Sequence, residues 1–290
     1  MKVLITGGSG LLGAKLRVIF EENKYDVYVL FHKKPITGKN CFQIDITQKN
    51  DVFQVLKKIS PDVVVHTAAY TNVDECEKNK DIAFAVNVQG TENVANATEK
   101  LNAKFLYIST DYVFNGNKGR YKEEDATDPI DFYGITKLEG EKSVTNICSD
   151  FVIARPSVIY GAAKKNFVTW VIDMFKNKKN FNIVTDQYVS PTFNGDLAKQ
   201  LVALIDQDKT GIFHTAGGER ISRYAFVKSI ADIFNFDETF IDVIKMEDMN
   251  WIARRPKDSS LDVSKISKYK KPCLIAESLN LFKEEIEGQI

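Results

Sequence analysis

Short apolar runs alternate along the first half of the chain with longer segments whose apolar residues recur at helical spacing. Compact runs rich in β-branched residues indicate buried strands, whereas apolar residues three and four positions apart indicate amphipathic helices. This alternation predicts an α/β fold, a Rossmann doubly wound parallel sheet with helices on both faces. The predicted strands are 2–5, 25–31, 62–69, 104–110 and 151–157, and the predicted helices are 11–22, 50–59, 81–101 and 132–144.

The regularity weakens after about residue 165, although no repeat or linker rich in proline and glycine interrupts the chain there. We expect residues 1–165 to form the Rossmann domain, segments near 193–215 to return to it, and residues 166–290 to form mostly a smaller C-terminal substrate-binding lobe. Ligands of open α/β sheets collect at the carboxyl ends of the strands, where such a lobe would close over them. Helices are predicted over 166–177, 194–206 and 222–234, and a strand over 210–217.

The composition narrows the classes of partner. The 39 basic and 39 acidic residues cancel, so neither nucleic acid nor an anionic membrane surface is expected to bind through overall charge. Cys41, Cys76, Cys148 and Cys273 lack the spacing of a disulfide framework or a zinc site, and we expect no metal. Because no apolar N-terminal stretch resembles a signal peptide or a membrane span, we expect a cytoplasmic protein.

A glycine-rich turn follows the first predicted strand and leads directly into a helix. Gly7, Gly10 and Gly13 fit G-x-x-G-x-x-G, and Gly8 with the last two also fits G-x-G-x-x-G. Glycines allow a tight turn and a close approach of the backbone to a pyrophosphate, which the helix N-terminus attracts. The turn predicts a dinucleotide site made by Gly7, Ser9, Gly10, Leu11, Leu12 and Gly13.

The end of the second strand distinguishes the two nicotinamide cofactors, because an acidic residue there would bind the ribose 2′-hydroxyl of NAD. This chain instead has His32, Lys33 and Lys34. Cationic side chains can pair with a 2′-phosphate, so NADPH is favoured and NADH is the alternative cofactor. The competing interpretation is that the two lysines are solvated loop charges.

Tyr-x-x-x-Lys places a tyrosine and a lysine on one side of a helix, as hydride transfer in this fold would require. Position favours the first of the three occurrences, since it opens a helix that follows the strand ending at Ser109 and Thr110. The second lies beside a glycine just after a strand, and the third lies in a C-terminal helix. The three pairs are Tyr133 and Lys137, Tyr160 and Lys164, and Tyr224 and Lys228.

Five motifs in order carry a family resemblance. They are TGGSGLLG from Thr6, STDYVFNG from Ser109, YGITK from Tyr133, DQYVSPT from Asp186 and RRPKDSSLD from Arg254. Together they resemble the extended short-chain dehydrogenases/reductases, most closely the dTDP-4-dehydrorhamnose reductases. The resemblance implies NADPH-dependent reduction of the C4 keto group of a nucleotide-linked 6-deoxy sugar, dTDP-4-dehydro-L-rhamnose to dTDP-L-rhamnose.

The resemblance also implies roles for individual residues. Tyr133 would protonate the carbonyl oxygen, Lys137 would lower the pKa of that tyrosine and hold the nicotinamide ribose, and Thr110 would polarise the carbonyl. Fold and family pattern also place cofactor-binding residues after the third and fourth strands. Asn87 would belong to a support network of the active site, and the competing interpretation is an ordinary exposed helix residue. The cofactor candidates are Asp45, Ile46, Ala68, Ala69, Tyr70 and Asn87, and the substrate candidates are Asp111, Tyr112, Phe114, Asn166, Phe167, Gln187 and Arg255.

Two departures leave alternatives open. Val158 stands where these reductases usually have a tryptophan near the sugar nucleotide. Residues 119–142 and the basic segment 32–34 also resemble the β regulatory subunit of methionine adenosyltransferase, an NADP-binding relative, although Thr110 favours the enzyme because that branch has serine. A nucleotide-sugar epimerase or dehydratase is the third alternative, against which the basic end of the second strand argues. The expected partners are a nucleotide-sugar substrate and, for assembly, a second copy of the chain as a homodimer.

Overall fold

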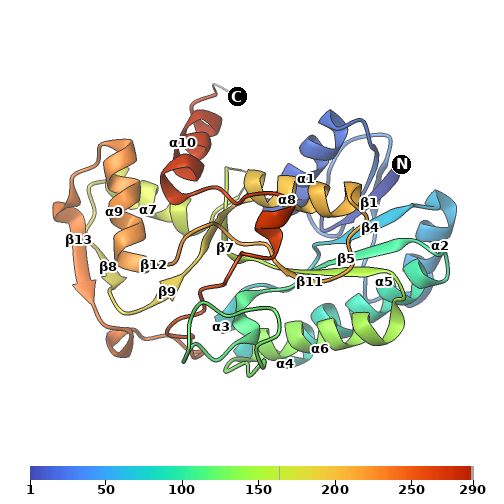
Figure 1. Ribbon diagram of the computed structural model, residues 1–290, viewed down its shortest axis with the longest axis horizontal. Helices are drawn as coiled ribbons and strands as arrows, with labels where there is room; N and C mark the ends of the chain where they lie inside the picture. Colours follow the sequence, from blue (N-terminus) through green and yellow to red (C-terminus); the bar gives the residue numbers. More distant parts are fainter. Residues whose placement is uncertain (163, 289–290) are drawn as a thin grey trace.

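A parallel seven-stranded sheet forms the centre of the molecule in the computed structural model, which describes residues 1–162 and 164–288 (Figure 1). The strand order β11-β6-β5-β4-β1-β2-β3 reverses direction at β1 and β4, as in a doubly wound fold. The predicted fold class is confirmed. The strands are β1 (Lys2–Thr6), β2 (Asp26–Phe31), β3 (Cys41–Gln43), β4 (Val63–His66), β5 (Lys104–Ile108), β6 (Phe151–Arg155) and β11 (Gly211–His214).

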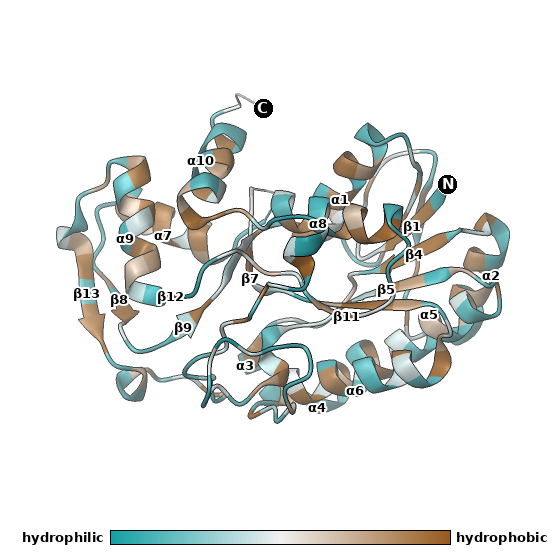
Figure 2. Ribbon diagram, in the orientation of Figure 1, coloured by the Kyte–Doolittle hydropathy of each residue, from teal (hydrophilic) through white to brown (hydrophobic). Residues whose placement is uncertain are grey.

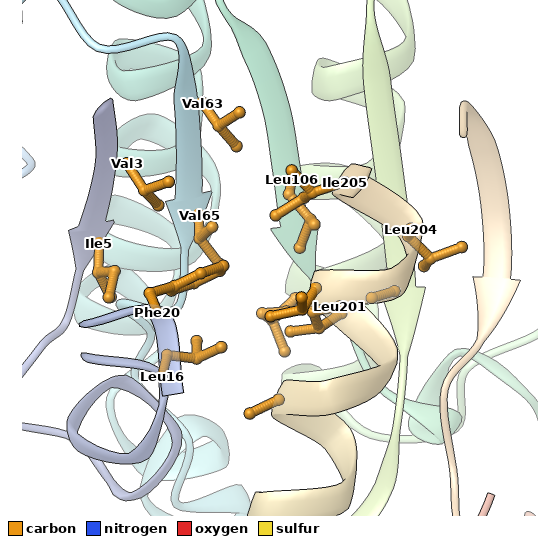
Figure 3. Packing of buried hydrophobic residues seen from close by; sticks show 14 of the residues in the cluster. Val3, Ile5, Leu16, Phe20, Val63, Val65, Leu106, Leu201, Leu204 and Ile205 are labelled. Carbon is orange, nitrogen blue, oxygen red and sulfur yellow. The ribbon is translucent and has the colours of Figure 1, made fainter. Parts of the chain in front are cut away.

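The strands read as continuous apolar runs because helices cover both faces of the sheet. One face carries α1 (Leu11–Glu22) and α8 (Asn194–Asp206); the other carries α2 (Lys49–Ile59), α5 (Gly90–Glu99) and α6 (Phe132–Ile147). Figure 3 shows side chains of α1 and α8 meeting those of β1, β4 and β5, including Leu16, Phe20, Leu201, Val3 and Val65. Colouring by hydropathy shows the same apolar centre (Figure 2).

The C-terminal half contributes to two parts of the molecule. α8 and β11 belong to the main sheet and its cover, because β11 pairs with β6. The remainder forms a smaller lobe around Tyr160, Phe226 and Phe282. Its helices are α7 (Phe167–Lys176), α9 (Arg223–Phe234) and α10 (Ile275–Ile286), and its strand pairs are β7 (Ser157–Tyr160) with β10 (Pro191–Phe193), β8 (Phe181–Val184) with β13 (Ile241–Ile244), and β9 (Tyr188–Val189) with β12 (Ile221–Ser222).

The helix predicted over 81–101 is divided. It consists of α4 (Lys80–Phe84), one turn of π-helix (Ala85–Gln89) and α5, and α3 (Val73–Lys78) precedes it. A π-turn adds a residue to the helical turn and changes which side chains face the protein interior. None of the helices in the described part of the chain is long and apolar enough to cross a membrane.

A buried ion pair joins α6 to the sheet. Arg155, the last residue of β6, donates to Glu141 of α6 through Nε at 2.8 Å and Nη2 at 2.6 Å. The Ser109 hydroxyl donates to the same carboxylate at 2.5 Å. The two charged side chains are only 3% and 5% exposed, so each depends on the other for compensation of its charge.

We expect Glu141→Ala to lower the free energy of unfolding by about 3–5 kcal/mol, because it leaves the Arg155 guanidinium buried without its partner. The matched control is Glu139→Ala on the same helix, whose exposed ion pair with Lys142 should contribute less than about 1 kcal/mol. Urea denaturation measures both values. Equal losses in the two variants would contradict this assignment.

Candidate active site

The glycine turn between β1 and α1 is packed too closely to accept side chains. Gly7 has φ of +66°, and a Cβ there would lie 2.7 Å from the backbone nitrogen of Ala68. A Cβ on Gly13 would lie 2.4 Å from the carbonyl oxygen of Gly7. The N-terminus of α1 carries neither a capping side chain nor an acidic residue in its first turn. Its free N–H groups therefore fit the pyrophosphate of a dinucleotide.

Charged side chains of both signs lie at the ends of β2 and β3. His32, Lys33 and Lys34 are exposed, and Asp45 Oδ2 lies 3.8 Å from His32 Nε2. Although burial opposes it, hydrogen bonds from Thr47 and the charges of His32 and Lys33 lower the pKa of Asp45. This edge of the sheet can therefore offer cations to a phosphate and a carboxylate to a hydroxyl or amino group.

Asn87 in the π-turn is fully buried, so the interpretation of it as an ordinary exposed helix residue is wrong. Its Nδ2 donates to the carbonyl of Tyr70 and to Thr136 Oγ1, both at 3.0 Å, and its Oδ1 accepts from the N–H of Tyr70 at 2.8 Å. Asn87 thus connects the loop after β4 to α6, one residue before Lys137. Its effect on a cofactor would be through the position of these two segments.

Tyr133 and Lys137 lie one turn apart near the start of α6. Asp131 caps this helix by accepting from the N–H of Gly134 at 2.8 Å. Burial raises the pKa of Tyr133, and its interaction with the Thr110 hydroxyl acts in the opposite direction. Burial lowers the pKa of Lys137 to about 7, although the charge of Glu141 opposes this change. The three candidate catalytic residues therefore belong to one cluster.

The other two Tyr-x-x-x-Lys pairs do not reach this cluster. Tyr160 is fully buried in the core of the smaller lobe, where its hydroxyl donates to Ser278 at 2.7 Å. Tyr224 packs at the edge of the same core, and Lys228 pairs with Glu238. Both pairs serve the packing or the surface of that lobe.

A cleft of about 290 Å³ lies between Tyr112, in the segment after β5, and the smaller lobe. Four of its residues were expected from the sequence, namely Tyr112, Phe167, Gln187 and Arg255. The remaining residues had no motif and were missed: Trp170, Asn182, Ile183, Val184, Arg223, Met249 and Trp251. Most of them come from the smaller lobe and from the segment before Arg255, which chain order alone does not bring together.

Two arginines give this cleft its charge. Arg223 lies 4.6 Å from the centre of the Phe167 ring and donates to Gln187 Oε1 at 3.3 Å, and its buried Nη1 has no protein partner among the described residues. Arg255 pairs with Asp74 at 2.9 Å and lies 5.5 Å from the Trp251 ring. Guanidinium groups and aromatic faces in one cleft suit an anion linked to a planar base.

Two substrate candidates face elsewhere, and those assignments are corrected. Phe114 is fully buried and stacks on Tyr121 with ring centres 4.2 Å apart, because an apolar ring gains more in that core than beside a polar ligand. Asn166 is the N-cap of α7, where Oδ1 accepts from Val168 and Thr169 and Nδ2 donates to two backbone carbonyls. Its hydrogen-bonding capacity is already used within the protein.

Asp111 is also enclosed, since it is only 2% exposed. Its carboxylate accepts from the hydroxyls of Thr110, Ser157 and Ser259 rather than facing the cleft. Val158, the departure from the family pattern, has φ of +43°, which is a rare conformation for a β-branched residue. In the described residues, no group of three or more His, Cys, Asp or Glu side chains is arranged to hold a metal ion.

Comparison with known proteins identifies the family of this chain. The family model described as the RmlD substrate binding domain matches residues 1–284. The chain is 34% identical to a dTDP-4-dehydrorhamnose reductase of Aggregatibacter actinomycetemcomitans, covering 91% of this chain and 92% of that protein. It is 32% identical to methionine adenosyltransferase 2 subunit beta of Bos taurus, covering 91% and 81%. The crystal structure of dTDP-4-dehydrorhamnose reductase from Bacillus anthracis in complex with NADP is 33% identical with a TM-score of 0.90, covering 98% and 99%.

We expect Lys137→Met to raise the free energy of unfolding near pH 7 by roughly 1–4 kcal/mol, because burial in the folded protein disfavours the lysine charge. Between the folded pKa of about 7 and the unfolded value of 10.5, Lys137 binds more protons in the unfolded chain, so its contribution to wild-type stability rises with pH in that range. The gain from Lys137→Met should shrink accordingly as the pH rises. Thermal unfolding across this range measures it.

Lys142→Met on the same helix is the matched control, since that ammonium is exposed and should change stability by less than about 1 kcal/mol at any pH in the range. A gain for Lys137→Met that is independent of pH would show that packing, rather than charge burial, is responsible.

Proposed function

This chain belongs to the RmlD substrate binding domain family, and we propose that it reduces the C4 keto group of a nucleotide-linked 6-deoxy sugar with NADPH. The proposed reaction converts dTDP-4-dehydro-L-rhamnose to dTDP-L-rhamnose. It is supported by two relatives whose names specify a dTDP-4-dehydrorhamnose reductase. The observation that carries the proposal is that Tyr133, which shares α6 with Lys137, lies with its ring 6.0 Å from that of Tyr112. Tyr112 follows Thr110 by two residues and lines the cleft that holds two arginines.

NADPH is the cofactor that the phosphate-binding features fit. The turn around Gly7 and Gly13 packs too closely for side chains, and the N-terminus of α1 has no side-chain cap, so its N–H groups suit a pyrophosphate. His32 and Lys33 supply the cations for a 2′-phosphate. The bound nicotinamide supplies the hydride that reaches C4 of the sugar.

Proton transfer falls to the side chains of the cluster. Tyr133 donates its phenolic proton to the C4 oxygen as that oxygen gains charge, and Thr110 donates a hydrogen bond to the same atom. Burial keeps Tyr133 protonated in the protein alone. A cationic Lys137 makes the phenol a stronger acid, and the negative charge of a bound dinucleotide favours that cationic form. The product is an alcohol, with one hydride and one proton added to the carbonyl.

The cleft supplies recognition of the nucleotide. The Nη1 of Arg223 has no hydrogen-bond partner among the described residues, so it suits a diphosphate that enters the cleft. Arg255 is already paired with Asp74 and would share its charge between that carboxylate and the ligand. Trp170 and Trp251 offer faces on which a planar base stacks.

Tyr133→Phe should lower kcat by about 100-fold or more, because loss of the proton donor removes general-acid catalysis. Tyr224→Phe is the matched control from another Tyr-x-x-x-Lys pair and should retain wild-type kcat. NADPH absorbance is followed after addition of dTDP-4-dehydro-L-rhamnose to the purified protein. If the wild-type protein oxidises no NADPH but captures a methionine adenosyltransferase and changes its kinetics, the regulatory alternative replaces this proposal.

Arg223→Gln should raise KM for the nucleotide sugar by about 10- to 100-fold, since it removes a charged hydrogen-bond donor from the diphosphate. kcat and the affinity for NADPH should change much less. The control is Arg220→Gln. Arg220 lies three residues before Arg223, is exposed and pairs with Asp258. The recognition role is refuted when both variants have the same KM as the wild type.

A further inference from the structure

The hydroxyl of Thr110 has one proton and two candidate acceptors. In the proposed reaction that proton must point to the C4 oxygen of the sugar. In the structure, Thr110 Oγ1 lies 3.1 Å from Asp111 Oδ1. Thr110 Oγ1 also accepts from the N–H of Tyr112 at 3.2 Å. An ionised Asp111 can only accept, so it would hold the Thr110 proton away from the substrate.

The hydrogen bonds that Asp111 accepts from described side chains all come from hydroxyl groups. Its other oxygen accepts from Ser157 Oγ at 2.7 Å and from Ser259 Oγ at 2.5 Å. Ser157 Oγ in turn accepts from the N–H of Ser190 at 3.3 Å, which leaves its own proton for the carboxylate. One enclosed carboxyl group therefore joins three parts of the chain. They are the segment after β5 with Thr110, β7 with Ser157, and the segment after Arg255 with Ser259. All its hydrogen-bond donors are neutral.

We infer that Asp111 acts in its protonated form as a positioning residue, donating to Thr110 Oγ1 and thereby directing the Thr110 proton to the substrate oxygen. This inference rests on the proposed function. Asp111 keeps its own proton throughout, and the proton that the product gains comes from Tyr133. The Thr110 oxygen then accepts from Asp111 and from Tyr112, and its single proton is free for the ligand.

The charges around Asp111 act in both directions. Burial raises its pKa, while hydrogen bonds from Ser259, Ser157 and Thr110 and the charge of Arg223 on α9 lower it. Asp131 and Tyr133 on α6 and Tyr112 beside it also face this carboxyl, and their anionic forms would favour the protonated acid. A diphosphate on Arg223 would offset the attraction of that cation. Substrate binding therefore favours the protonated form of Asp111.

Asp111→Asn is the decisive variant, because its amide N–H₂ can donate permanently to Thr110 while its oxygen accepts from both serines. We expect kcat of Asp111→Asn to stay within about threefold of the wild type. Wild-type kcat should decline as the pH rises and Asp111 loses its proton. In the variant the decline should begin at higher pH, because only Tyr133 and Lys137 can then lose protons. Loss of about 100-fold in kcat, or an unchanged alkaline decline, would overturn the inference.

Asp131→Asn is the matched control, since burial raises the pKa of that carboxyl to about 7 and asparagine is an equally good helix cap. It should leave the alkaline decline at the wild-type pH, and a decline that Asp131→Asn moves to higher pH also overturns the role of Asp111. Thermal unfolding shows whether each variant is folded.

Ser259→Ala provides an independent test, including the case in which Asp111→Asn does not fold. It removes a hydrogen bond that favours the ionised carboxylate, so the alkaline decline should move to higher pH. No shift, or a shift to lower pH, contradicts the inference. An active wild type with these negative results rejects only the role of Asp111, whereas a wild type that oxidises no NADPH with the sugar nucleotide rejects the proposed function itself.

Discussion

The close docking of α6 on the sheet is the interaction on which the candidate site depends. A Cβ on Gly134 would lie 2.2 Å from the carbonyl oxygen of Tyr112, and one on Gly140 would lie 2.2 Å from the hydroxyl of Tyr107. Such an approach leaves no room for water, so the polar side chains of the buried face must bond to protein groups. Thr136 bonds to Asn87 and Glu141 to Arg155, and these contacts set the position of Lys137.

The same burial decides the protonation of the site. Without ligand, burial lowers the pKa of Lys137 and raises the pKa of Tyr133. Both side chains therefore favour their neutral forms, because each charged form would lie away from water. The two side chains therefore suit a reaction in which an anionic cofactor restores the lysine charge and the tyrosine gives up a proton. In the proposed reaction the charged form of Lys137 depends on bound ligand. Burial therefore keeps Lys137 and Tyr133 in their neutral forms until the ligand binds.

The smaller lobe extends the site from the sheet edge to the nucleotide cleft. The Asp111 carboxyl accepts hydrogen bonds from Ser157 of β7 and from Ser259. The segment after β5 and the smaller lobe are therefore joined at this buried side chain. Arg223 at the start of α9 and Arg255 in the C-terminal segment meet in the adjacent cleft. The proposed catalytic and recognition residues are thus held by one set of contacts across distant parts of the chain.

The amino-acid sequence determined the features that depend on local pattern. Apolar runs specified six of the seven strands of the main sheet, all but β3. The spacing of Gly7, Gly10 and Gly13 specified the glycine turn, and helical spacing put Tyr133 and Lys137 on one face. Local pattern could not reveal the π-turn that buries Asn87, or the Nη1 of Arg223 that has no partner among the described residues. Both depend on which distant residues surround them. For the same reason it misplaced Phe114 and Asn166, which satisfy packing and capping instead of the cleft. Burial, partner and charge state are properties of the packed chain, and only the folded arrangement assigns them.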